Sequence, residues 1–145
     1  MAVHHTLGAA ETIALGRALA SELGPGDVVA FFGELGSGKT TMIKGIAAGL
    51  GVTETVRSPS FVIVTEYRGR LPVYHVDLYR LADETALGCA ELDEYLEGEG
   101  VCLIEWSERL SVPLPARAWR VRIELEQAGR SVSIERPSGP AEPVE

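Results

Sequence analysis

Three observations on this 145-residue sequence predict an α/β fold. Short apolar runs rich in β-branched and aromatic residues alternate with segments that have helical spacing. A glycine-rich turn joins one of these runs to the helix that follows it. Two segments near the C-terminus alternate apolar and polar residues around a turn, which is typical of an antiparallel hairpin. Together they predict a mixed, mainly parallel central sheet with a C-terminal β-hairpin at its edge.

The first half of the chain predicts helix, strand, loop and helix in that order. Residues 11–23 have apolar side chains at helical spacing and stop at Gly24-Pro25-Gly26. Residues 28–32, Val-Val-Ala-Phe-Phe, form the short apolar run that a buried strand needs. Residues 41–50 return to helical spacing, and Gly51 stands at the expected stop.

The second half predicts further strands and one more helix. A helix with a break near Gly88 is expected at 83–96. The expected strands lie at 61–67, 73–77, 101–105, 120–126 and 131–135, the last two forming the hairpin. The length predicts a single domain over residues 1–136, and the Pro- and acid-rich residues 137–145 are expected to be a disordered tail.

Residues 33–40 carry the most specific chemistry in the chain. They read Gly-Glu-Leu-Gly-Ser-Gly-Lys-Thr, the phosphate-binding P-loop pattern G-x-x-x-x-G-K-[ST], and they lie between a predicted strand and a predicted helix. This order predicts a P-loop NTPase fold. The glycines let successive backbone N–H groups turn toward phosphate charge, and the helix dipole favours the same charge. The expected nucleotide-binding residues are Gly33, Glu34, Leu35, Gly36, Ser37, Gly38, Lys39, Thr40 and Thr41.

Two side chains of this motif have assigned roles. Lys39 is expected to bring its charge to the β- and γ-phosphates as a catalytic group, from a solvent-facing junction between loop and helix. The Thr40 hydroxyl is placed to ligate Mg²⁺.

Hydrolysis also needs a carboxylate at the end of a neighbouring strand, to hold Mg²⁺ or to orient water. Asp77 ends the run Val-Tyr-His-Val-Asp, and Glu105 ends the run Val-Cys-Leu-Ile-Glu. Both are candidates because strand carboxyl ends bind ligands in α/β sheets. Each acid could instead cap a helix or form an ion pair. The residue pattern leaves open which acid serves the metal and which orients water.

Other polar residues have both a functional and a structural interpretation. The hydroxyls of Ser58-Pro59-Ser60 can sense a γ-phosphate as switch loops do, or can simply form a turn. Trp106 can pack in the core or close the site. Arg80 can neutralise transition-state charge, although pairing with an acid is the commoner use of such a residue.

Composition limits the classes of partner. The net charge of −8 argues against direct binding to a nucleic-acid backbone, which requires clustered Lys and Arg. Cys89 and Cys102 form no C-x-x-C pair and are expected to be reduced, with Cys102 in the core. No apolar run has the length of a membrane span and no secretory signal is visible, so a cytoplasmic location is expected.

Four blocks together resemble the TsaE family, the small bacterial ATPases of tRNA threonylcarbamoyladenosine (t6A) synthesis. They are the P-loop through Thr41, Ser58-Pro59-Ser60-Phe61, His75-Val76-Asp77-Leu78-Tyr79-Arg80 and Ile104-Glu105-Trp106. The resemblance runs from about Thr6 to Glu135. The blocks that begin at His75 and at Ile104 are far more specific than the P-loop. The sequence departs from the family pattern at Ser60, usually Thr, and at Glu34, more often Asp.

The resemblance implies an ATP- and Mg²⁺-dependent enzyme that works with TsaB and TsaD, which modify A37 of tRNA. It implies that Thr40 and Glu105 hold the metal, that Asp77 acts near the γ-phosphate, and that residues 58–61 are a switch. The tRNA would be reached only through the partners. The expected switch or partner-contact residues are Ser58, Ser60, Phe61, Arg80 and Trp106. It also implies an adenine pocket between the C-terminal hairpin and the N-terminal segment, formed by Ala9, Ala10, Glu11, Thr12 and Arg130.

Two other classes fit the P-loop. A small-molecule kinase shares the motif, but it usually carries a mobile arginine-bearing lid, and the arginines at 109, 117, 120 and 122 are spread out. A nucleotide-gated binding module would use the ATP state and not turnover. Because no arginine stands beside the P-loop as a finger would, hydrolysis by the isolated chain is expected to be slow.

Overall fold

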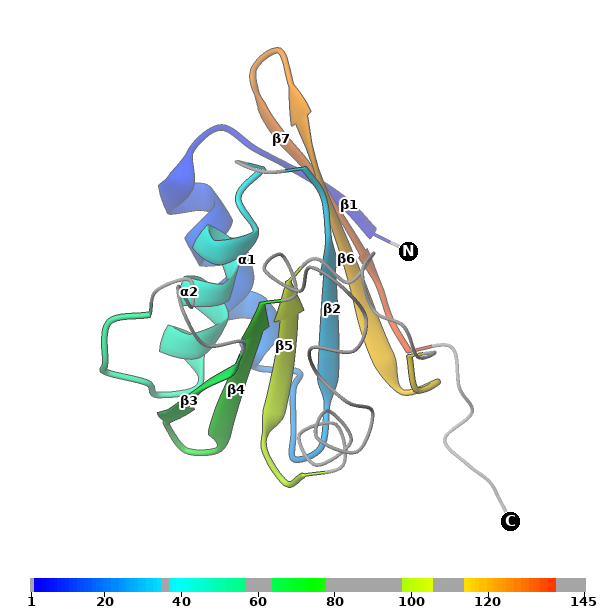
Figure 1. Ribbon diagram of the computed structural model, residues 1–145. Coiled ribbons are helices and arrows are strands. Elements are labelled where there is room, and N and C mark those ends of the chain that lie inside the picture. Colours follow the sequence, from blue (N-terminus) through cyan, green and yellow to red (C-terminus); the bar gives the residue numbers. More distant parts are fainter. Residues whose placement is uncertain (1, 35–36, 57–63, 78–97, 106–113, 138–145) are drawn as a thin grey trace.

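The computed structural model describes residues 2–34, 37–56, 64–77, 98–105 and 114–137. Within these ranges the chain forms one seven-stranded sheet and two helices that lie on the same face of it (Figure 1). The helices are α1 (Ala9–Ala20) and α2 (Lys39–Gly49). The strands are β1 (Ala2–Thr6), β2 (Val28–Phe32), β3 (Val64–Arg68), β4 (Pro72–Asp77), β5 (Val101–Glu105), β6 (Ala118–Glu126) and β7 (Gly129–Glu135).

The sheet is mixed with a parallel centre, as the sequence predicts. Its strand order is β1-β7-β6-β2-β5-β4-β3. The four central strands β6, β2, β5 and β4 run parallel to one another. The outer strands pair antiparallel: β3 with β4 on one side, and β7 with β6 and then β1 with β7 on the other. Because the four central strands are parallel, their carboxyl ends lie together on the same side of the molecule. At that side β2 leads into the P-loop.

The N-terminal strand corrects the expected position of the hairpin. The sequence predicts β6 and β7 at the sheet edge, but β6 pairs in parallel with β2, and β1 covers the far side of β7. The sequence gives no sign of β1, because Ala-Val-His-His-Thr has little apolar character and four of its five residues are exposed. Pairing with β7, at the other end of the chain, makes this segment a strand.

The two helices approach each other closely through glycines. A Cβ built at Gly16 of α1 would lie 2.4 Å from the carbonyl oxygen of Met42. A Cβ built at Gly45 of α2 would lie 2.1 Å from the carbonyl oxygen of Ile13. Neither position has room for a side chain at this helix separation. The glycines therefore allow α1 and α2 to pack side by side against one sheet face (Figure 1).

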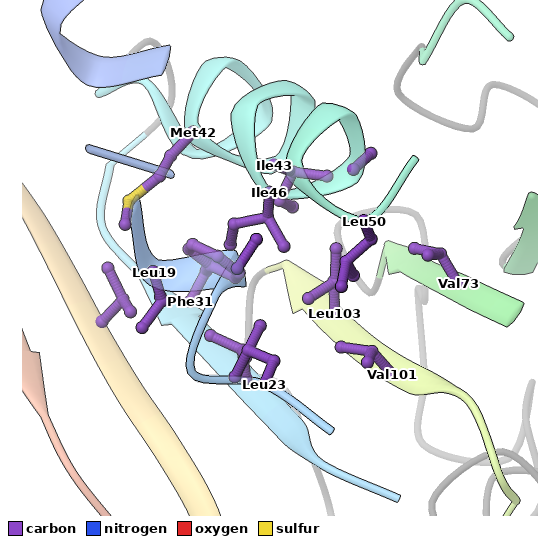
Figure 2. Close-up of a cluster of buried hydrophobic side chains, with 14 of the residues drawn as sticks. Leu19, Leu23, Phe31, Met42, Ile43, Ile46, Leu50, Val73, Val101 and Leu103 are labelled. Atoms are coloured by element: carbon purple, nitrogen blue, oxygen red, sulfur yellow. The ribbon is translucent and has the colours of Figure 1, made fainter. Parts of the chain in front are cut away.

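The core lies between these helices and the sheet. Alternate residues of the central strands point into it, because successive side chains of a strand face opposite sides. Figure 2 shows members of this cluster from both layers: Leu19, Leu23, Phe31, Met42, Ile43, Ile46, Leu50, Val73, Val101 and Leu103. Burying this apolar surface fixes α2, and with it the P-loop, over β2, β5 and β4.

Some expected elements lie outside the described residues. These are the helix at 83–96, the tail from 138 onward, residues 61–63 of the expected strand at 61–67, and Cys89. Cys102 is buried as expected, and its thiol is free. Neither of the helices that the structure describes is long and apolar enough to cross a membrane.

Candidate functional site

The candidate site lies where the N-terminus of α2 meets the carboxyl ends of β2, β4 and β5. The loop that follows Phe32 turns through the P-loop and enters α2 at Lys39. Asp77 ends β4 and Glu105 ends β5, and the two are register partners in adjacent parallel strands. Side chains of register partners face the same side of a sheet. The two predicted acids therefore lie next to each other on the face that carries α2.

The P-loop backbone depends on glycine at two described positions. Gly33 has φ +148° and Gly38 has φ +114°, in the region that L side chains rarely adopt. A Cβ at Gly33 would also lie 2.5 Å from the carbonyl oxygen of Ile123 and 2.9 Å from Ser37 Oγ. The loop thus has no room for a larger residue at Gly33, which explains this part of the motif sterically.

Lys39 corrects one expectation. The sequence places its side chain in solvent, but the structure buries it to 4% exposure. The ammonium donates a hydrogen bond to the carbonyl oxygen of Gly33, so the side chain folds back across the loop that it follows. A buried positive charge is costly unless anionic or dipolar groups surround it. Its placement inside the loop is what phosphate binding requires.

The hydroxyl of Ser37 is a buried polar group in the P-loop. Ser37 is 1% exposed, and its Oγ has no hydrogen-bond partner among the described residues. Its carbonyl oxygen accepts a hydrogen bond from Nε of Arg130 at 2.8 Å. Buried polar atoms are almost always paired, so an unpaired one in this loop fits a ligand that supplies oxygen acceptors.

Thr40 and Glu105 meet directly. Thr40 Oγ1 lies 3.0 Å from Oε1 and 2.9 Å from Oε2 of Glu105. Glu105 is only 3% exposed, and Thr40 is half-buried in the first turn of α2. A hydroxyl and a carboxylate at this distance are two oxygen ligands of the kind Mg²⁺ prefers. The structure thus brings together the two residues that the resemblance assigns to the metal.

His75 is the site residue that sequence reasoning missed. Its side chain is fully buried, and Nε2 lies 2.5 Å from Oε2 of Glu105. One signal was available in the sequence. His75 is two residues before Asp77 in one strand, so the strand period of two puts both on the same face. The register of β4 against β5, which joins His75 to Glu105, was not available.

The remaining P-loop residues have ordinary positions. Glu34 is exposed, and its carbonyl oxygen accepts a hydrogen bond from the Ser37 amide at 3.0 Å. The backbone of Glu34 thus takes part in the turn of the loop. Thr41 is half-buried in the first turn of α2.

The N-terminal segment and the hairpin do meet near the P-loop. Thr6 of β1 is the register partner of Arg130 of β7, whose guanidinium reaches Ser37. Two of the four predicted adenine-side residues of α1 have local roles. Glu11 Oε1 accepts a hydrogen bond from the Leu7 amide at 2.9 Å, and Thr12 Oγ1 lies 2.8 Å from Thr6 Oγ1. The other two, Ala9 and Ala10, are exposed.

Several predicted site residues lie outside the described part of the chain. They are Leu35, Gly36, Ser58, Ser60, Phe61, Arg80 and Trp106. The predicted switch and partner contacts therefore stay predictions.

The donor set fits Mg²⁺ bound together with a nucleotide. In the part of the chain that the structure describes, no group of three or more His, Cys, Asp or Glu side chains is arranged to hold a metal. Mg²⁺ takes one or two protein oxygens and completes its shell with phosphates and water. Thr40 and Glu105 supply that number.

Comparisons with known proteins agree on one family. The family described as threonylcarbamoyl adenosine biosynthesis protein TsaE matches residues 7–132. The tRNA threonylcarbamoyladenosine biosynthesis protein TsaE of Bacillus subtilis is 47% identical over 126 residues, which cover 86% of this chain and 77% of that protein. The protein of the same description from Treponema pallidum is 42% identical and covers 87% and 94%. A crystal structure of Bacillus subtilis YdiB superposes with a TM-score of 0.80 at 38% identity, covering 95% of this chain and 86% of that one.

Proposed function

The chain belongs to the TsaE family, which takes part in threonylcarbamoyladenosine biosynthesis, and on this premise we propose that it is a Mg²⁺-dependent ATPase. It supports t6A modification of tRNA together with TsaB and TsaD. One observation carries the proposal. The Thr40 hydroxyl at the start of α2 lies within 3.0 Å of both carboxylate oxygens of Glu105, at the end of the neighbouring parallel strand β5.

The P-loop binds the phosphate chain of ATP. Three features support this assignment: the positive φ angles of Gly33 and Gly38, the buried hydroxyl of Ser37, which has no hydrogen-bond partner within the described ranges, and the buried ammonium of Lys39. The first two create a narrow concave backbone with a polar lining. Lys39 supplies the full positive charge inside it, and its neighbour Thr40 begins the helix whose dipole favours anions.

Thr40 and Glu105 hold Mg²⁺, and Asp77 orients the attacking water. When bound, Mg²⁺ neutralises charge that develops on the phosphate oxygens. Glu105 is the acid in contact with Thr40, which favours it for the metal over Asp77. Asp77 is 5% exposed and is the register partner of Glu105, so its carboxylate lies beside the metal position. Glu105 thus serves the metal and Asp77 serves the water.

The adenine lies at the junction of the N-terminal segment and the β6–β7 hairpin. Leu7 is 70% exposed, and a Cβ at Gly129 in the hairpin turn would lie 3.0 Å from its Cα. An exposed apolar side chain beside this turn offers a surface on which a base can pack. Arg130 links the same hairpin to the P-loop through the Ser37 carbonyl, so base and phosphate positions are coupled.

The partners supply what this chain lacks. With a net charge of −8, it is not suited to grip tRNA, so TsaB and TsaD hold the RNA and this cytoplasmic protein docks on them. The sequence offers no arginine finger beside the P-loop, but the structure brings Arg130 there, where its guanidinium donates to the carbonyl oxygens of Ser37 and Gly129. Because those two hydrogen bonds hold Arg130 on the loop backbone, we expect the partners to supply the group that stimulates hydrolysis. An arginine finger changes rates by roughly 10³–10⁵-fold.

Steady-state ATP hydrolysis tests the proposal. The rate is measured for the chain alone, with TsaB and TsaD, and with tRNA alone, each with Mg²⁺ and with excess chelator. We expect slow hydrolysis by the chain alone, marked stimulation by TsaB and TsaD, and loss of hydrolysis in chelator. Fast turnover without partners would contradict the proposal and favour an autonomous kinase. Stimulation by tRNA alone would equally contradict it.

A further inference from the structure

The buried pair of His75 and Glu105 has a geometry that packing alone does not require. His75 lies in β4 with no exposed surface, and its Nε2 is 2.5 Å from Glu105 Oε2. Its register partner in β5 is Leu103, a core residue, and Val73 two residues earlier is also in the core. An aliphatic side chain would fill such a position without needing a partner. An aliphatic residue would therefore satisfy packing at this position, and the imidazole adds a hydrogen bond to Glu105.

The surroundings decide which ring nitrogen carries the proton. Nδ1 of His75 is buried and has no hydrogen-bond partner among the described residues. Because a buried N–H without an acceptor is unfavourable, the proton belongs on Nε2. Nε2 then donates to the carboxylate of Glu105, which only accepts hydrogen bonds when ionised.

Two donors from two elements fix the carboxylate of Glu105. The single hydroxyl proton of Thr40 lies within reach of both carboxylate oxygens, whereas Nε2 of His75 contacts Oε2 only. A carboxylate oxygen can accept about two hydrogen bonds. Oε2 is therefore the oxygen engaged by His75, and among the described residues Oε1 has at most the Thr40 hydroxyl, so it keeps acceptor capacity.

We propose that His75 is a positioning residue that holds the Glu105 carboxylate with Oε1 available for Mg²⁺. This inference rests on the proposed function for the identity of the metal. His75 does not touch the metal or the nucleotide in this assignment; it acts by removing the rotational freedom of Glu105. Groups that hydrogen-bond a metal ligand from outside commonly change metal affinity by about 10–100-fold when they are replaced.

The first test needs neither metal nor nucleotide. Long-range ¹H–¹⁵N correlation spectra of the ligand-free protein report which nitrogen of each histidine is protonated, and His75→Gln assigns the signal. We expect His75 with its proton on Nε2. A proton on Nδ1 with none on Nε2 would overturn the proposal, because His75 could not then donate to Glu105. This result is independent of whether the protein hydrolyses ATP.

The second test compares two replacements of His75. His75→Leu fills the space without a donor, whereas the amide nitrogen of His75→Gln can take the place of Nε2. Binding of Mn²⁺, a paramagnetic substitute for Mg²⁺, is measured by electron paramagnetic resonance in the presence of a non-hydrolysable ATP analogue. We expect about 10–100-fold weaker Mn²⁺ binding in His75→Leu and recovery of most of this loss in His75→Gln. Binding of the analogue without metal should be the same in both variants.

The control uses another histidine, His4, which is exposed in β1 and whose register partner is Val132 in β7. His4→Leu should leave Mn²⁺ binding unchanged. Equal Mn²⁺ affinity in wild type and His75→Leu would overturn the positioning role and leave His75 as core packing. A wild-type protein that binds no Mn²⁺ with nucleotide would instead overturn the proposed function, and the tautomer would still decide whether His75 holds Glu105.

Discussion

The hydroxyl of Thr40 lies 2.9 and 3.0 Å from the two carboxylate oxygens of Glu105, although 65 positions separate the residues in the chain. The contact joins the first turn of α2 to the end of β5. It exists because β2 and β5 are parallel neighbours, so that the helix following one strand begins beside the carboxyl end of the other. Predictions about metal binding begin from this pair.

Thr40→Val removes the hydroxyl and keeps the shape of the side chain. We expect Mg²⁺-dependent ATP hydrolysis to fall by at least about ten-fold, because one of two protein oxygens is lost. Thr40→Ser keeps the oxygen and should retain most of the activity. The measurement is the Mg²⁺ concentration dependence of hydrolysis in the presence of TsaB and TsaD. Equal Mg²⁺ dependence of the Val and Ser variants would exclude Thr40 as a ligand.

Lys39→Ala should weaken ATP binding by about ten- to a hundred-fold, the value of a charge-assisted contact to phosphate. Titration calorimetry measures the affinity, and thermal unfolding checks that the variant is folded, since Lys39 is buried. Lys44→Ala is the control, because Lys44 is exposed on the same helix. If ATP affinity is the same in all three proteins, the P-loop does not bind phosphate through Lys39.

Asp77→Asn and Glu105→Gln separate the two acids. Each substitution replaces one carboxylate oxygen with an amide nitrogen, which removes the negative charge and keeps the side-chain shape. We expect both to reduce hydrolysis more than ATP binding, since the negative charge is needed for metal or water positioning and not for phosphate contact. Only Glu105→Gln should also weaken Mn²⁺ binding. A variant whose turnover stays within about two-fold of wild type identifies a structural acid.

Gly16→Ala and Gly45→Ala should each destabilise the fold by about 1–3 kcal/mol, because the new Cβ meets backbone of the other helix at 2.4 and 2.1 Å. In an open helix the same exchange would stabilise by up to about 1 kcal/mol. Gly24→Ala is the control, since a Cβ there meets nothing within 4 Å. Urea unfolding measures the difference. Stability equal to wild type at both positions would show that the helices can move apart at little cost.

Burial raises the pKa of the Cys102 thiol from 9.0 to about 12, partly opposed by the nearby positive charge of Arg117. Between these pH values the native thiol keeps its proton while the unfolded one loses it. Stability should therefore fall by up to about 1.4 kcal/mol per pH unit in this window, relative to Cys102→Ala. Unfolding in urea from pH 8 to 11 measures the difference. Parallel stability curves for the two proteins would contradict the expected proton linkage.

Thiol labelling gives a second measure of the same burial. In a Cys89→Ser background, Cys102 should react with Ellman's reagent only as fast as the protein unfolds. Immediate reaction at neutral pH would show that the thiol is accessible.

The sequence alone determined the local features and the family. The strand β2 and the helix α2 were predicted with bounds within two residues of those observed, because strand and helix periodicity are properties of neighbouring residues. The predicted strand at 101–105 has the observed bounds, and the comparisons confirm the TsaE family that the motifs indicated.

Only the tertiary structure decided which residues share the site and how deeply they are buried. His75 and Glu105 are 30 positions apart, and their contact depends on the register of β4 against β5. The edge position of β1 depends on pairing with β7 from the far end of the chain, and Lys39 is buried by the loop closing over it. Strand pairing and loop closure join residues distant in sequence, so no local pattern records them.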